Sequence, residues 1–250
     1  MLNRDEVFSI AIQLDCLDLL SFCQVNKYIN KCLGEIWIYK LKQDFPGFKI
    51  FNKSFKNTYK LLYSLSKLKN IFNLHENIYD IYERKKLYLS DFNLEIPKEI
   101  SVLINLRELD LSSNDLEIFP KEIYHLTNLE ELDLGNNLLT EISEGISRLL
   151  KLKVLNLSEN QLTEVSKELG EIKNLEKLYL TNNFLSNLPK ELGHLKNLQE
   201  IGLSRNLLKE IPYELINLPQ LHSIYLNQNP QLRIPVEFLQ KEELIIYHYV

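Results

Sequence analysis

Residues 106–116 of this 250-residue chain read LRELDLSSNDL. The same arrangement of leucines and one asparagine begins again, each time 23 residues later, at Leu129, Leu152, Leu175, Leu198 and Leu221. Six copies at a constant interval form an internal repeat. A single copy is too short to bury its own apolar side chains, so we expect the copies to stack around one continuous core.

The alternation within each copy predicts a short strand. Leu109 and Leu111 are two residues apart, as are Leu132 and Leu134, so each pair points to one side of an extended chain. An asparagine follows in every copy, at Asn114, Asn137, Asn160, Asn183, Asn206 and Asn229. Its side chain can satisfy backbone groups of a tight turn and of the next repeat, so we interpret this column as structural.

The pattern LxxLxLxxNxL resembles the leucine-rich repeat family over residues 87–232, in six to seven copies. The first copy, from Leu87, lacks the asparagine and runs one residue short, as expected of a terminal repeat. The resemblance implies an α/β fold, namely a leucine-rich repeat solenoid with a parallel β-sheet on its concave face and short helical turns on its convex face. We expect residues 233–250 to form a C-terminal cap.

The second half of each copy predicts the helical turn. Its start is marked by Pro97, Pro120, Pro189, Pro212 and Pro235, with Ser143 and Ser166 in two copies. Proline suits the first helical position and serine suits a cap. Apolar pairs such as Ile123 and Leu126 then face the core. This style of repeat is similar to the intracellular Ras-suppressor class of leucine-rich repeats.

A different pattern precedes the repeats. Asn3 and Glu6 match a capping box, and apolar residues follow at helical spacing. A longer amphipathic pattern from Val25 to Trp37 predicts a helix that ends near Pro46. Residues 45–75 contain six lysines and no acid, and their leucines and tyrosines predict a linking helix. We interpret the lysines as a solvated face rather than as a binding site for nucleic acid or membrane.

The N-terminal run, residues 2–48, resembles an F-box, with Asp18-Leu19-Leu20 in its middle and Ile36-Trp37 near its end. The family usually has Leu-Pro at the start, where this chain has Leu2-Asn3. The resemblance implies docking on a Skp1-type adaptor and, through it, on a cullin ubiquitin ligase. The adaptor-facing residues that it implies are Leu2, Val7, Ile10, Leu14, Leu19 and Val25. Divergent heads of this style also resemble those of host-mimicking proteins from large DNA viruses.

We therefore expect four segments. Residues 1–48 form an F-box-like helical domain, 49–86 a helical linker or N-terminal cap, 87–232 the repeats and 233–250 the C-terminal cap. The expected function is that of a non-catalytic substrate receptor, whose head docks a ubiquitin-ligase adaptor while the repeats select a target protein. The alternative is a scaffold that binds a signalling protein such as a small GTPase, with the N-terminal helices only capping the solenoid.

The residues beside each inward leucine point out of the concave face. Read across the copies, the candidate protein-binding residues are Glu108, Asp110, Glu131, Asp133, Asn156, Lys177, Tyr179, Arg205 and Tyr225. Acids cluster in the early copies and tyrosines in the later ones, a combination that suits protein recognition. We expect a basic partner segment at the acidic end. An ordinary hydrophilic face without a specific partner is the alternative.

Composition narrows the function classes. The net charge of −5 divides into +5 for residues 1–86 and −10 for residues 87–250, and such an acidic solenoid disfavours nucleic-acid binding. No apolar run reaches the roughly 20 residues of a membrane span. No signal peptide is recognisable, and Cys16, Cys23 and Cys32 contain no CxxC pair. We therefore expect an intracellular protein, in the cytoplasm, the nucleus or a host cytoplasm.

No catalytic arrangement emerges from the sequence. Asp110 and Asp133 would lie one strand apart, near the carboxylate separation of a retaining glycosidase, but on an open ridge without a pocket. His125 and His194 share a column three repeats apart, roughly 14 Å, which is too far for one metal ion. We expect no enzymatic activity, no metal or other cofactor, and a monomer.

Overall fold

A computed structural model describes residues 27–45, 55–93 and 95–248. The chain divides into two compact units, Met1–Ile81 and Tyr82–Val250. The repeats lie in the second unit, which begins slightly before Leu87, the residue at which the sequence pattern begins.

Two helices of the first unit pack together through aromatic side chains. α3 spans Lys27–Asp44 and α4 spans Phe55–Ile71, so a helix is present on each of the predicted segments. The ring centroids of Trp37 and Tyr59 are 5.2 Å apart, and the Tyr59 hydroxyl donates to Asp44 Oδ2 at 2.5 Å. α4 thus packs on α3, and both helices belong to the unit Met1–Ile81.

A third helix, α5 (Ile78–Glu83), does not follow from the sequence pattern. It begins at an asparagine cap, because Asn77 Oδ1 accepts the backbone N–H groups of Tyr79 at 2.9 Å and Asp80 at 3.0 Å. Its six residues are too few to display apolar periodicity, which is why the pattern does not reveal it.

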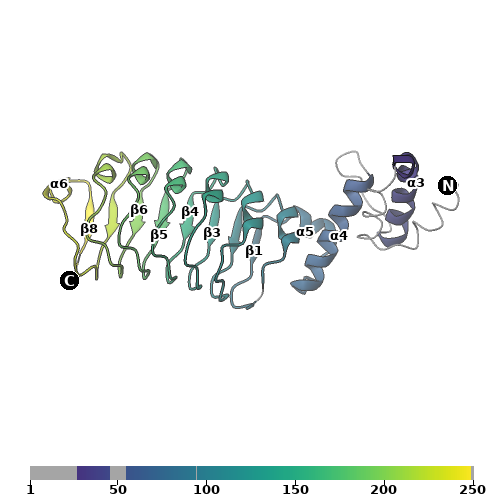
Figure 1. Ribbon diagram of the computed structural model, residues 1–250, viewed down its shortest axis with the longest axis horizontal. Helices are drawn as coiled ribbons and strands as arrows, with labels where there is room; N and C mark the ends of the chain where they lie inside the picture. The colour runs from purple at the N-terminus through teal and green to yellow at the C-terminus, as the bar shows by residue number, and fades with distance from the viewer. Residues whose placement is uncertain (1–26, 46–54, 94, 249–250) are drawn as a thin grey trace. The chain divides into compact units, whose positions relative to one another are not determined.

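Eight parallel strands form one sheet whose order follows the chain (Figure 1). They are β1 (Lys86–Tyr88), β2 (Glu108–Asp110), β3 (Glu131–Asp133), β4 (Val154–Asn156), β5 (Lys177–Tyr179), β6 (Glu200–Gly202), β7 (Ser223–Tyr225) and β8 (Ile245–Tyr247). Neighbouring strands pair without any shift in register, as Leu109 with Leu132 and Leu132 with Leu155. The solenoid and its parallel sheet are thus confirmed. The segment expected as a cap also adds a strand, because β8 pairs with β7.

The second half of each repeat forms a 3-10 helix. These helices are η1 (Lys98–Val102), η2 (Lys121–His125), η3 (Glu144–Arg148), η4 (Lys167–Glu171), η5 (Lys190–His194) and η6 (Tyr213–Asn217), followed by the α-helical turn α6 (Val236–Leu239). Residues i and i+3 align in a 3-10 helix. Ile123 and Leu126 can therefore both be fully buried although the turn is only five residues long.

The prolines and serines stand at the caps of these turns, one residue before the helical position predicted for proline. Pro97 has extended backbone angles, and its carbonyl accepts the N–H of Ile100 at 3.0 Å. Proline fits here because a capping residue needs no N–H and has a φ that the ring allows. The serines do not cap through their hydroxyls. Ser143 Oγ instead lies 2.8 Å from the Tyr124 hydroxyl.

The core of the second unit is built from the repeated leucines. The middle residue of every strand from β1 to β7 is at most 2% exposed, as are Leu111 and Leu134 behind the strands. Burying one such side chain contributes roughly 1.5–3 kcal/mol. Each repeat buries a similar set of such side chains, so the stack is stabilised along its whole length.

The buried asparagines bond each repeat to the one before it. Asn160 Nδ2 donates to the carbonyls of Leu134 at 2.9 Å and Leu157 at 3.1 Å, and its Oδ1 accepts the N–H of Leu139 at 3.0 Å. The same bond to the preceding repeat is made by Asn114, Asn137, Asn183, Asn206 and Asn229. The structural role is as predicted. The neighbour to which the asparagine bonds differs from the prediction, because the inter-repeat partners lie in the preceding repeat rather than in the next one.

A left-handed residue precedes each of these asparagines. The residues with positive φ at this position are Ser113, Asn136, Glu159, Asn182, Arg205 and Gln228. Most L-residues adopt this conformation at a cost of roughly 1–2 kcal/mol. The asparagine that follows each of these residues is buried and hydrogen-bonded to the preceding repeat, and these bonds offset the cost of the turn.

Replacing Asn160 by alanine should lower the free energy of unfolding by about 2–3 kcal/mol, because the buried N–H of Leu139 loses its acceptor. Chemical denaturation followed by circular dichroism measures this loss. Asn174→Ala is the matched control: its exposed side chain makes one bond, to the Leu150 carbonyl at 2.7 Å, and its loss should cost less than about 1 kcal/mol. Equal losses in the two variants would contradict the structural role of the column.

Candidate functional site

The concave face presents two columns of side chains. The first residues of the strands line up as Lys86, Glu108, Glu131, Val154, Lys177, Glu200, Ser223 and Ile245. The third residues line up as Tyr88, Asp110, Asp133, Asn156, Tyr179, Gly202, Tyr225 and Tyr247. Since the middle residues are buried, both columns emerge on the opposite side of the sheet. Eight of the nine predicted binding residues therefore share this face.

Arg205 is the exception. β6 ends at Gly202, so Arg205 lies in the turn beyond the strand, with a left-handed φ of 54°. Its Nε donates to Gln228 Oε1 at 2.6 Å, a contact between equivalent turns of neighbouring repeats. Arg205 thus belongs to the edge of the face rather than to either column.

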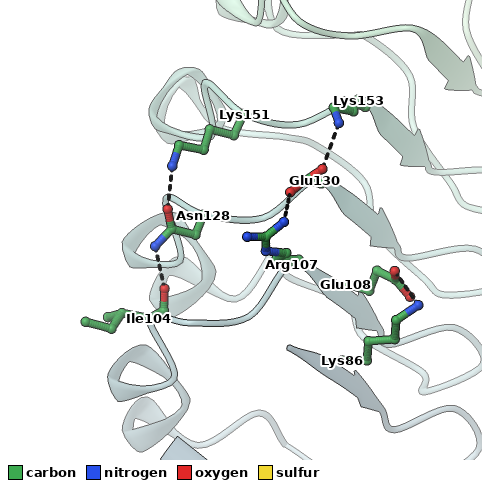
Figure 2. A network of polar contacts seen from close by, with 8 residues as sticks. All are labelled: Lys86, Ile104, Arg107, Glu108, Asn128, Glu130, Lys151 and Lys153. Carbon is green, nitrogen blue, oxygen red and sulfur yellow. Dashed lines mark hydrogen bonds and ion pairs between the residues drawn. The ribbon is translucent and has the colours of Figure 1, made fainter. Parts of the chain in front are cut away.

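The acid nearest the first strand is already paired. Lys86 Nζ lies 2.6 Å from Glu108 Oε1, and the Tyr88 hydroxyl donates to Glu108 Oε2 at 3.1 Å (Figure 2 shows the lysine contact). The hydrogen bond from Lys86 lowers the pKa of the Glu108 carboxyl and raises the pKa of Lys86. Glu108 remains ionised, but its charge is compensated within the chain.

Asp110, Asp133 and Asn156 shape the turns that follow their strands. Asp110 Oδ1 accepts the N–H of Ser112 at 2.9 Å, and Asp133 Oδ1 accepts the N–H of Gly135 at 2.8 Å. Asn156 Nδ2 also donates to Asp133 Oδ1 at 3.0 Å. Such bonds are typical of Asx turns. Replacing either aspartate would therefore disturb the backbone as well as the charge of the face.

Glu131 is the acid of this end whose carboxylate has no bonding partner among the described residues. It is exposed, and within the described part of the chain its carboxylate makes no hydrogen bond or ion pair. A hollow of about 170 Å³ opens beside it. The lining residues are Tyr88, Glu108, Leu109, Asp110, Glu131, Leu132, Asp133, Val154 and Asn156. An aromatic ring and carboxylates around one hollow suit a cationic side chain.

Three tyrosines gather at the other end of the face. The rings of Tyr225 and Tyr247 stack, with centroids 4.5 Å apart and an interplanar angle of 6°. Gly202 stands between Tyr179 and Tyr225 in the second column, and a Cβ built on it would lie 3.2 Å from Tyr179 Cδ1. The Tyr179 ring therefore leans over the glycine. Tyr247 is not among the residues predicted from the sequence, because residues 233–250 were expected to form a cap without a strand.

Glu200 lies in the first column beside these tyrosines. Burial raises the pKa of Tyr179 and of Tyr225, and the negative charge of Glu200 raises both further. The carboxylate of Glu200 is thus close to both phenols. Its register position, opposite Lys177 and Ser223, can be read from the sequence, although the sequence analysis did not select it.

A row of charged residues borders the face one position before the strands. Figure 2 shows Glu130 between two bases: Oε1 is 3.1 Å from Arg107 Nη1, and Oε2 is 2.8 Å from Lys153 Nζ. The hydrogen bond from Lys153 lowers the pKa of Glu130. Nearby, Lys151 Nζ donates to Asn128 Oδ1 at 2.7 Å. These contacts join successive repeats. In the sequence these contacts correspond to alternating charges 23 residues apart, at Arg107, Glu130 and Lys153, a pattern that was not among the predictions.

The residues considered for catalysis or metal binding do not converge. Asp110 and Asp133 lie on the open face, and His125 and His194 are exposed at the ends of η2 and η5. Among the described residues, no group of three or more His, Cys, Asp or Glu is placed to hold a metal ion. No helix in this part of the chain has the length and apolar character needed to cross a membrane.

The predicted adaptor-facing residues lie outside the described part of the chain; they are Leu2, Val7, Ile10, Leu14, Leu19 and Val25. Of the F-box-like run, Ile36 and Trp37 lie on α3 and are buried, at 0% and 1% exposed.

Comparison with protein families supports the repeat pattern. A family described as leucine rich repeat matches residues 127–171 and 173–230, and a family of two leucine-rich-repeat copies matches residues 104–148. Together these matches span half of the chain. A search of curated proteins finds no match to the sequence.

Solved structures with similar folds include proteins of three different organisms. A leucine-rich repeat protein of Leptospira interrogans is 34% identical, with a TM-score of 0.55 over 70% of this chain and 51% of its own. The ectodomain of the Arabidopsis thaliana receptor kinase GASSHO1/SCHENGEN3, in complex with CASPARIAN STRIP INTEGRITY FACTOR 2, is 27% identical, with a TM-score of 0.55 over 66% and 24%. The Toll–Spatzle complex of Drosophila is 30% identical, with a TM-score of 0.54 over 62% and 22%. The chain thus spans about half of the first relative and a quarter or less of the others.

Proposed function

This chain belongs to the leucine-rich repeat family, and we propose that it is a non-catalytic protein-interaction module whose concave face binds a target protein. The observation that supports this most is the face itself. It is an eight-strand array in one register, with exposed or half-buried acids at one end and stacked tyrosines at the other. Rigid arrays of aromatic and charged side chains suit protein recognition.

The similar structures support the same kind of function. Two of them are complexes, one with CASPARIAN STRIP INTEGRITY FACTOR 2 and one of Toll with Spatzle. We transfer from them only the use of the fold for binding another protein, because this chain spans 24% and 22% of those proteins. As part of the same proposal, we expect this chain to bind its target inside the cell.

The acidic end is the part of the face that we assign to a basic segment of the target. Of its four acids, Glu108 is paired with Lys86, and the two aspartates bond to their own turns. Glu131 alone among the four is exposed, unpaired within the described chain, and next to the hollow. It is therefore the residue whose charge a partner would meet.

Charge reversal at Glu131 should weaken target binding by about tenfold or more, because a lysine there would repel the basic segment. The measurement is quantitative capture, with proximity labelling on the full chain used first to identify the target. Glu164→Lys is the matched control, since Glu164 is exposed and lies outside both columns. The proposal is wrong if Glu131→Lys binds the target as well as the unmodified chain and the control do.

A finer proposal concerns the first unit, which we assign to docking on a Skp1-type adaptor of a cullin ubiquitin ligase. The chain would then act by tethering, which raises the effective concentration of the target near the ligase. Two observations favour it over a simple cap. Met1–Ile81 is a compact unit of its own, and Trp37 is buried against Tyr59 inside it. The competing proposal is a repeat scaffold that binds a small GTPase, as the Ras-suppressor-like repeat style suggests.

Co-expression with a Skp1-type adaptor discriminates between these functions. The unmodified chain should co-purify with the adaptor, and a double change of Ile10→Asp and Leu14→Asp should abolish this, because both residues belong to the implied apolar docking surface. Glu131→Lys serves as the control and should leave adaptor binding intact. If the unmodified chain does not bind the adaptor, or the double variant still does, the adaptor proposal fails and the GTPase scaffold is favoured.

A further inference from the structure

The tyrosine cluster provides a second position on the face that suits a cation. Tyr225 is stacked on Tyr247 of β8 by one of its ring faces, so its other face is directed toward β6. In β6 the aligned residue is Gly202, so no side chain of that strand covers the Tyr225 ring, and the Tyr179 ring leans over this glycine from the preceding strand. Glu200, from the same strand, places a negative charge close to the phenols. An aromatic face beside a carboxylate attracts guanidinium and ammonium groups.

The charges of the face favour the same kind of occupant. Its first column contains Glu108, Glu131 and Glu200, against Lys86 and Lys177. The second column adds two aspartates and no base. After the pairing of Glu108 with Lys86, the face keeps Asp110, Glu131 and Asp133 at one end and Glu200 toward the other, with Lys177 between Glu131 and Glu200. A partner with positive charge at its ends and neutral residues between them would be complementary.

The register of the sheet fixes the distance between the two positions. Glu131 begins β3 and Glu200 begins β6, so they stand in the same column three strands apart. At the usual strand spacing this separation is about 14 Å. Four residues of an extended chain cover about 13–14 Å, and residues i and i+4 point to the same side of it. The two positions therefore match side chains four residues apart.

We propose that the concave face binds an extended basic segment of the target through two cationic side chains four residues apart. One enters the hollow beside Glu131, and the other lies against the Tyr225 ring beside Glu200. The positive charge of Lys177 repels a third cationic side chain between these two. The proposal rests on the assignment of the concave face to target binding and names the chemistry of the segment that is bound.

Fluorescence anisotropy with labelled nonapeptides of glycine, serine and two arginines tests the spacing. One isomer has the arginines four residues apart, and a second isomer of the same composition has them two residues apart. The first should bind the full chain about fivefold more tightly, since only it reaches both positions. A peptide with citrulline in place of arginine should not bind measurably.

Variants of the chain test the two positions separately. Glu131→Gln and Tyr225→Leu should each weaken the four-residue isomer about three- to tenfold, whereas Tyr225→Phe retains the ring and should bind as the unmodified chain does. Glu164→Gln is the matched control for the lost charge, and thermal melting verifies that each variant is folded. Equal binding of the two isomers, or no loss in Glu131→Gln and Tyr225→Leu, overturns the proposal. If target capture still depends on Glu131 in that case, the assigned function stands and only the spacing rule fails.

Discussion

The structure of the repeat unit depends on one hydrogen-bonding arrangement, the buried asparagine amide. The carbonyl of Leu134 accepts from Asn137 in its own repeat and from Asn160 in the following one, so the same group closes a turn and joins two repeats. Backbone groups at this depth cannot reach water and must be paired inside the protein. The first copy has Phe92 in this position, and the side chain of Asn114 accepts its backbone N–H at 3.1 Å. A first repeat has no earlier repeat to bond, so it can dispense with the asparagine.

The asparagines and leucines have separate roles, and the face follows from both. The leucines supply the burial that drives stacking, but apolar contact alone has no direction and would tolerate a slip between repeats. The asparagine bonds and the strand pairing fix the register instead. Because every strand is in register, the outward residues fall into two straight columns at a constant spacing. Variation in sequence can then change the chemistry of the face without changing its geometry.

Much of the fold and part of the site could be predicted from the sequence. The 23-residue interval predicts the strands, the turns and both columns, because identical copies must stack identically. β8 was not predicted, since the positions that hold Leu221 and Leu226 in the copy before it hold Glu243 and His248. The acids Glu108 and Glu131 occupy equivalent positions, yet one is paired with Lys86 and the other is not. That difference depends on the neighbouring strand in each case. Arg205 lies in the turn beyond β6, and the end of a three-residue strand is not marked in the sequence.

Native-state hydrogen exchange tests most directly whether the asparagines join the repeats. The informative amides are those that donate to an asparagine Oδ1 of the following repeat, namely Leu116, Leu139, Leu162, Leu185 and Leu208. They lie in loops, outside the strands and helices. If the asparagines join the repeats, these amides exchange as slowly as the amide of Leu157, which donates to the Tyr179 carbonyl at 2.8 Å within the stack. Exchange as fast as that of exposed loop amides would contradict this account.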